Sequence, residues 1–332
     1  MPLVIRLPTP EEKDRALRFQ VHHFYVLSIV DYLTDRYACF STSILQNVIA
    51  EQKGLAGIQR IQRRSDVDQQ ALSQYLCLGW ASELQLRLAN LSEPVLLRYS
   101  NAWAPIHAYY AVYMAAQAWF VAMGHREVVD NHTGSLNTIA NQVAARNLFP
   151  LPWSVTCSGC PQTSNATYHG LPHGVDPAVP CEVLSRPDPE TFWPRYCTLL
   201  RTTRERRLVR NFDEWKRRNG RHKMYAKEKD DVAKKLAPTT AFDFFWRLRV
   251  RSNYRDVRAF LMSGVDDEWQ EEFFRALLAF TDATCGVLHL LTVRYAGNDA
   301  YQAALDDFLG AQRTRVREIF DPFMQSKREA IT

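Results

Sequence analysis

Along most of the chain, apolar residues recur every three or four positions, which is the spacing of amphipathic helices. The first such run follows Thr9-Pro10-Glu11-Glu12, where a capping box with proline at the first helical position predicts a helix start. The same spacing predicts further helices over residues 41–51, 56–64, 66–90, 103–123, 135–147, 190–221, 240–262, 266–295 and 299–323. The sequence shows no convincing strand ladder, internal repeat or glycine-rich phosphate loop. We therefore expect an all-α helical bundle.

One region interrupts the helical pattern. Residues 149–189 hold eight of the sixteen prolines and show no sustained period. The same segment carries closely spaced cysteines and histidines. We expect a single irregular Cys/His/Pro-rich insert on the surface of one compact helical unit.

The composition is that of a soluble globular protein. Hydrophobic residues make up 46% and charged residues 23% of the 332 residues, which is enough to bury a large core. The net charge of +5, from 41 basic and 36 acidic residues, permits contact with nucleic acid without requiring it. Seven cysteines, and an N-terminus without the apolar core of a signal peptide, favour free thiols in a reducing cytoplasm.

Residues 99–125 contain no Asp, Glu, Lys or Arg and form the one stretch that suggests a membrane span. Pro105, His107 and four tyrosines dilute its apolar character. A helix buried at the centre of a bundle fits this composition better, so we expect no membrane contact.

Two stretches resemble a known family. Arg247-Leu-Arg-Val-Arg-Ser-Asn-Tyr254, read as Arg-x4-Ser-x-Tyr, resembles the Arg-x4-His-x-Tyr signature of the HEPN superfamily, with serine at the histidine position. His107-Ala-Tyr-Tyr-Ala-Val-Tyr-Met-Ala-Ala-Gln-Ala-Trp119 resembles the helix that packs beside the motif helix in such domains. The resemblance implies a HEPN-like bundle over residues 99–332, an N-terminal helical layer over residues 1–98, and a homodimer.

HEPN domains occur in RNA-cleaving toxins, antiviral effectors and inert antitoxin or RNA-binding relatives. The resemblance implies an RNA-directed protein of prokaryotic defence or toxin–antitoxin type, with metal-independent endoribonuclease activity. Arg247 would stabilise charge developing on the phosphate, and Tyr254 would position the substrate. Ser252 does not titrate near neutral pH and cannot replace histidine in proton transfer. A catalytically inert module that binds RNA or a protein partner, such as an antitoxin, is therefore the alternative.

A cleaving protein would need another histidine as acid or base. His107 is one candidate, and a hydrogen-bonded core histidine is the other interpretation of that residue. His222, which ends a literal Arg-x4-His sequence beginning at Arg217, is a second candidate.

Arginines of the motif helix are expected to contact RNA phosphates. On an ideal helix, Arg247, Arg251 and Arg258 align as one stripe, and Arg255 lies at its edge. The alternative is a solvated arginine face on an amphipathic helix.

A second basic segment precedes the motif helix. Residues 201–235 carry fourteen Lys or Arg against six Asp or Glu. Arg204 and Arg207 lie along one edge of the predicted helix and are further candidates for binding RNA. The alternative is a solvated helical hairpin whose charges pair with neighbouring carboxylates.

The irregular insert contains a candidate metal site. Cys157-Ser-Gly-Cys160 is followed by His169, His173 and Cys181. Because a Cys-x2-Cys turn can present two thiolates to one tetrahedral ion, Cys157, Cys160, His169 and Cys181 are the predicted ligands of a structural zinc. The alternative is a loop with buried or free thiols. No catalytic cofactor is expected.

Overall fold

The structure is a computed structural model that describes residues 9–88, 94–125, 131–255, 259–260, 266–310 and 314–331. Helical elements make up 74% of the described residues, which confirms the all-α prediction. The helices are α1 (Pro10–Arg36), α2 (Ile44–Gly54), α3 (Ala56–Gln59), α4 (Gln69–Arg87), α5 (Pro94–Ala122), α6 (His132–Ala145), α7 (Phe192–Arg218), α8 (Ala226–Lys234), α9 (Ala241–Val250), α11 (Asp267–Ala296), α12 (Asn298–Gly310) and α13 (Thr314–Ile331).

Shorter elements connect these helices. The 3-10 turns are η1 (Ser41–Ser43), η2 (Pro161–Thr163) and η3 (Pro189–Thr191), and the π turn η4 (Arg251–Arg255) continues α9. The strands are β1 (Thr156–Cys160) and β2 (Asn165–His169).

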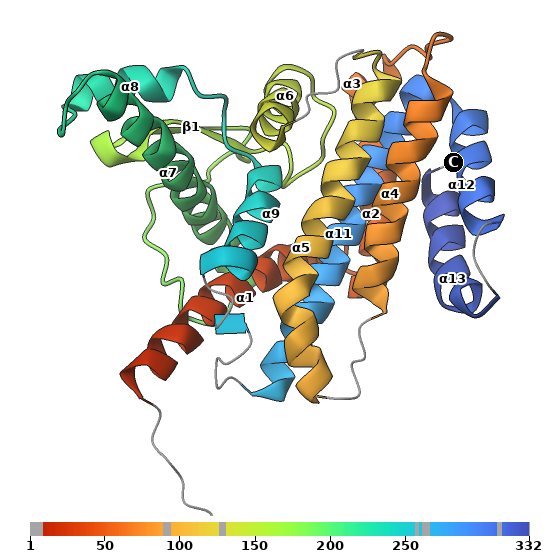
Figure 1. Cartoon of the computed structure of the whole chain (residues 1–332), viewed down its shortest axis with the longest axis horizontal. Coiled ribbons are helices and arrows are strands. Elements are labelled where there is room, and N and C mark those ends of the chain that lie inside the picture. The colour runs from red at the N-terminus through yellow and green to blue at the C-terminus, as the bar shows by residue number, and fades with distance from the viewer. Residues whose placement is uncertain are drawn as a thin grey trace, which may run out of the picture.

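The long helices α5 and α11 lie side by side at the centre of the bundle, with α4 against α5 and α2 against α11 (Figure 1). Ala108, Ala111 and Ala115 of α5 are fully buried, and their small side chains allow neighbouring helices to pack closely. Helices α12 and α13 lie on one side of this centre, and α6, α7, α8 and the strands lie on the other (Figure 1). The N-terminal helices α1, α2 and α4 contribute to the same cores as the later helices.

Part of the insert forms a β-hairpin that the sequence pattern did not predict, whereas residues 170–188 are irregular and lie at the surface, as expected. Strands β1 and β2 pair in antiparallel register from Thr156 opposite His169 to Cys160 opposite Asn165. Gly159 has a φ of 74°, and a Cβ there would lie 1.8 Å from the Asn165 carbonyl oxygen, so only glycine fits this close approach. Strands of five residues carry too little alternation to be detected in the sequence. The start of the insert is also buried, since Trp153 is fully inaccessible.

Several helix boundaries differ from the sequence pattern; α3 ends at Gln59 rather than at residue 64, and α5 begins at Pro94 rather than at residue 103. Helix α8 begins at a capping box formed by Tyr225 and Glu228 and was not expected as a separate element. The single helix expected over 299–323 is divided into α12 and α13. The motif helix expected over 240–262 is regular to Val250 and then widens into η4; residues 256–258 and 261–262 of that prediction lie outside the described residues.

Among the described helices, one is long and apolar enough to cross a membrane by length and composition. It is α11 rather than the stretch 99–125 singled out in the sequence, and 78% of its most apolar window is buried inside the protein. Such burial is typical of the core helix of a bundle.

Candidate nucleic-acid interface

A cleft of about 840 Å³ lies between α7 and the end of α9. Its lining comes from α7, α9 and the first residue of η4: Arg206, Val209, Arg210, Asp213, Glu214, Arg217, Trp246, Arg247, Val250 and Arg251. Five of these residues are arginines and two are acidic. The cleft therefore carries an excess of positive charge around a partly exposed indole ring.

The two carboxylates of the cleft are engaged by neighbouring cations. Asp213 lies 3.4 Å from the Lys216 Nζ, and Glu214 forms an ion pair with Arg218. Among the described residues, no carboxylate lies within ion-pair distance of Arg206, Arg210 or Arg217. These three guanidinium groups can therefore meet an external anion.

Arg247 forms the floor of the cleft and is only 4% exposed. Its Nη1 donates hydrogen bonds to Thr202 Oγ1 at 2.7 Å and to Thr203 Oγ1 at 3.0 Å, both on α7. Its guanidinium carbon lies 5.5 Å from the centre of the Tyr25 ring. The predicted phosphate-binding arginine of the motif thus lines an arginine-rich cleft, where it donates hydrogen bonds to two hydroxyl groups.

A second hollow of about 490 Å³ adjoins the first. The two share Arg206, Arg210, Glu214 and Trp246, so together they form one groove along α7, which we call the α7 groove. The second hollow extends to the start of α6, where Asn131, His132 and Thr133 line it.

Three tyrosines of α5 lie beside the α6 end of the groove. Tyr109, Tyr110 and Tyr113 have their ring centres 5.4, 6.3 and 4.8 Å from that of His132. Arg249 of α9 lies over the Tyr109 and Tyr110 rings and donates a hydrogen bond to Tyr110 Oη at 3.2 Å. The stretch 107–119 therefore does pack beside the motif helix, as the resemblance implied.

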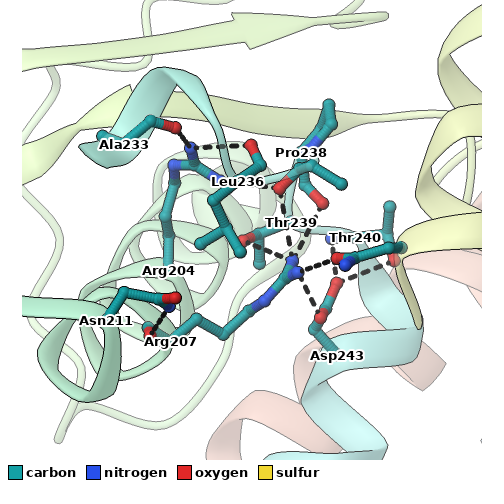
Figure 2. A network of polar contacts seen from close by, with 11 residues as sticks. Arg204, Arg207, Asn211, Ala233, Leu236, Pro238, Thr239, Thr240 and Asp243 are labelled. Carbon is teal, nitrogen blue, oxygen red and sulfur yellow. Dashed lines mark hydrogen bonds and ion pairs between the residues drawn. The ribbon is translucent and has the colours of Figure 1, made fainter. Parts of the chain in front are cut away.

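Arg204 and Arg207 are held by partners inside the protein, which differs from the expectation for the basic segment. Arg204 lines neither hollow, and Arg207 lines the second hollow but is only 7% exposed. Arg204 is fully buried and donates to the carbonyl oxygens of Gly159, Ala233 and Ala237 at 2.6, 3.0 and 3.0 Å. Burial lowers the pKa of Arg204 to about 10, so it remains charged at neutral pH. Its role is to join α7 to β1 through Gly159. It also joins α7 to the end of α8, through Ala233 (Figure 2).

Arg207 is held in a similar way. It donates to the Pro238 carbonyl oxygen at 2.9 Å and to Asn137 Oδ1 at 2.8 Å, and it lies 3.0 Å from the fully buried Asp243 Oδ1 (Figure 2). Burial raises the pKa of Asp243, whereas the positive charge of Arg207 and hydrogen bonds from Thr240 act in the opposite direction. Asp243 in turn caps α9, so this buried pair positions the helix that carries Trp246 and Arg247.

The remaining motif residues are placed differently. Ser252 is 1% exposed and its hydroxyl donates to the Arg249 carbonyl oxygen at 3.3 Å, so it lies within η4 rather than in the cleft. Arg251 lines the cleft. Arg258 and the side chains of Tyr254 and Arg255 lie outside the described residues.

His107 is separated from the arginines. It lines a different hollow, of about 400 Å³, with the exposed Leu88, Leu96, Tyr99 and Trp103. This hollow shares no lining residue with the α7 groove. Burial lowers the pKa of His107. The structure therefore does not bring His107 and Arg247 to one site.

Two histidines near the groove were missed by the sequence analysis. His132 lines the groove, and in the sequence it lies just before the helix predicted over residues 135–147. His22 of α1 is buried behind the cleft, stacked on Phe260 with ring centres 6.0 Å apart. Burial, followed by the charges of Arg247 and Arg251, lowers the pKa of His22 well below its usual value.

The predicted zinc ligands lie in different surroundings. Cys157 and Cys160 are fully buried in two different apolar clusters, and His169 is exposed. Burial raises the pKa of Cys157 to about 11, which keeps the thiol protonated at neutral pH. Within the described ranges, which include all four predicted ligands, no group of three or more His, Cys, Asp or Glu is arranged to hold a metal ion. The zinc site stays a prediction, and metal analysis of the protein and of Cys157→Ser tests it.

Comparisons with known proteins provide no relative: no family model matches the chain, and no curated protein or solved structure matches it. The resemblance to HEPN domains rests on residues 107–119 and 247–254 alone.

Proposed function

We propose that the protein is RNA-directed and binds single-stranded RNA in the α7 groove. The observation that carries this proposal is the sharing of Arg206, Arg210 and Trp246 by two adjoining hollows. Guanidinium groups bind phosphate oxygens through paired N–H donors, and a flat aromatic ring stacks on an unpaired base. The groove offers both kinds of contact.

The size of the groove favours a polymer over a single small anion. Each hollow, of about 840 and 490 Å³, falls within the usual range for a small-ligand site. Two adjoining hollows that share one indole suit successive nucleotides, with a base stacked on Trp246. The HEPN resemblance supports RNA as the polymer, a prokaryotic defence or toxin–antitoxin setting, and metal-independent cleavage as the reaction to test.

Binding of a fluorescently labelled single-stranded RNA, measured by anisotropy over a range of salt concentrations, tests this proposal. We expect the double variant Arg206→Ala/Arg210→Ala to bind at least about tenfold more weakly than wild type at low salt. Its salt dependence should also become shallower, by about 0.7 in the slope of log K against log salt for each phosphate that is no longer neutralised. Trp246→Ala should weaken binding with little change in that slope, because stacking releases no counterions.

Arg201→Ala is the matched control, because Arg201 is exposed on the same helix and lines neither hollow. It removes one positive charge and should leave the affinity within about twofold of wild type. An equal weakening in Arg201→Ala would show that net charge, rather than the groove, governs binding. Binding of an acidic peptide in preference to RNA would instead favour the alternative, an inert module that binds a protein partner.

A further inference from the structure

We propose that His132 is the proton-transfer group of an RNA-cleaving site in the α7 groove, and that Tyr109 is its positioning residue. This inference rests on the proposed binding of RNA. His132 is the first residue of α6 and lines the same hollow as Arg206 and Arg210. An RNA phosphate held by these two arginines would lie in the hollow that the imidazole lines.

The imidazole is held in place by its neighbours. His132 Nδ1 lies 2.7 Å from Tyr109 Oη, and the ring packs against Tyr113 with centres 4.8 Å apart. The backbone is fixed as well, because the Asn131 side chain accepts a hydrogen bond from Gly134 N at 2.7 Å and caps α6. A positioned base of this kind is what proton transfer requires.

The surroundings favour a neutral imidazole. The groups facing it are the three tyrosines of α5, Arg249 of α9, and, across the hollow, Arg206, Arg207, Arg210 and Glu214 of α7. Partial burial, followed by the charge of Arg249, lowers the pKa of His132. At neutral pH the ring therefore carries a lone pair.

The contact with Tyr109 fits the tautomer in which Nε2 carries that lone pair. Burial raises the pKa of Tyr109, so its phenol stays protonated and cannot itself act as the base. In the proposed site, Nδ1–H donates to Tyr109 Oη, and Nε2 keeps the lone pair for the substrate.

The reaction needs no metal and no added reactant. His132 Nε2 removes the proton from an RNA 2′-hydroxyl, and the 2′-oxygen forms a bond to the adjacent phosphorus. The bond from phosphorus to the 5′-oxygen breaks, and the imidazolium returns the same proton to that leaving oxygen. The products are a 2′,3′-cyclic phosphate and a 5′-hydroxyl. Arg206 and Arg210 stabilise the negative charge that develops on the phosphate oxygens.

The test uses the full-length protein and a 5′-labelled single-stranded RNA in the presence of chelator. Wild type should produce ends with 2′,3′-cyclic phosphate, and the same RNA with 2′-deoxyribose throughout should remain intact. His132→Asn should lower the cleavage rate by at least about 100-fold while leaving RNA affinity within about twofold. His125→Asn is the matched control, since His125 is exposed and lines neither hollow, and it should cleave at the wild-type rate.

Tyr109→Phe separates positioning from a merely structural role. It keeps the ring but removes the hydroxyl, and it should lower the rate and move the acidic limb of the pH–rate profile. A structural role would leave the position of that limb unchanged.

The possible failures are distinguishable. RNA that is bound but never cleaved by wild type, or cleaved equally well by His132→Asn, overturns this inference and leaves the proposed binding intact. Loss of cleavage in His107→Asn with retention in His132→Asn also overturns it. A wild-type protein that does not bind RNA overturns the proposed function itself.

Discussion

The inner and outer faces of α7 use the same residue type for opposite purposes. On the inner face, Arg204 and Arg207 are buried and are held by carbonyl oxygens and by Asp243. On the outer face, Arg206 and Arg210 line a groove and have no carboxylate partner among the described residues. The comparison teaches that a cluster of arginines in the sequence marks a binding surface only where the guanidinium groups remain accessible.

A buried cation also joins two helices on the other side of the molecule. At the opposite side of the bundle, Lys327 of α13 is fully buried and its Nζ donates to both carboxylate oxygens of Glu83 on α4, at 2.7 and 2.8 Å. This cation joins two helices, as Arg207 does. Buried ion pairs therefore serve the packing on both sides, and the groove depends on the arginines that remain outside.

The largest expected effect on stability comes from removing the guanidinium group of Arg207 on the inner face of α7. Arg207→Met leaves Asp243 as an uncompensated buried charge, so we expect the free energy of unfolding to fall by about 3–5 kcal/mol. Chemical denaturation followed by circular dichroism measures this. The double variant Arg207→Met/Asp243→Asn should recover part of the stability; no recovery would mean that the pair does not stabilise the fold through charge compensation.

Arg204 should matter less for stability, because its removal leaves neutral carbonyl groups rather than a carboxylate. Arg204→Met removes the donor for the Gly159, Ala233 and Ala237 carbonyl oxygens and should cost about 1–3 kcal/mol. The same denaturation assay measures it. A destabilisation larger than that of Arg207→Met would reverse the proposed ranking of the two arginines.

Acid should lower the free energy of unfolding without changing the charge of the arginines on the outer face of α7. The pKa of His22 is lowered by burial and by Arg247 and Arg251, so the folded state binds fewer protons than the unfolded state. Its contribution to stability is complete above the unfolded pKa of about 6.5 and is lost as the pH falls, by at most about 1.4 kcal/mol per pH unit. His22→Phe should reduce the difference in unfolding free energy between pH 7 and pH 5.

Two other titratable groups, His23 and Asp31, also change the free energy of unfolding between pH 7 and pH 5. Burial, followed by the charge of Arg186, lowers the pKa of His23 to about 4, which adds to the acid sensitivity. Burial and the charge of Glu272 raise the pKa of Asp31 to about 6, and its protonation below that pH acts in the opposite direction. An unchanged slope in His22→Phe would assign the acid sensitivity to these groups instead.

The smallest effect on stability is expected on the outer face. Arg206→Ala should change the free energy of unfolding by no more than about 0.5 kcal/mol, because the side chain forms no ion pair within the described part of the chain. RNA affinity should nevertheless fall in the anisotropy assay. A destabilisation as large as that of Arg204→Met would erase the distinction between the two faces.

Much of this arrangement could be predicted from the sequence. The burial of Arg204 could also have been predicted, but it was missed in the sequence analysis. Leu200, Arg204 and Leu208 follow one another at intervals of four residues, so the apolar period already places Arg204 on the buried face of α7. Arg206 and Arg210 lie off that period. Counting charges over residues 201–235 conceals this difference, whereas placing each arginine on the helix reveals it.

Other features could not be read in this way. The hydrogen bond between Tyr109 and His132 joins α5 to the start of α6 across residues 126–130, and neither residue carries a pattern that predicts its partner. The separation of Cys157 and Cys160 into different apolar clusters likewise depends on how the hairpin meets α7 and α8.

By itself, the sequence determined the all-α class, the course of most helices and the abundance of arginine around α7 and α9, because these follow from local spacing and composition. Only the tertiary structure decided which guanidinium groups are accessible and which histidine lies among them. The reason is physical: accessibility and electrostatic environment depend on the helices that pack against a side chain, and those neighbours come from distant parts of the chain.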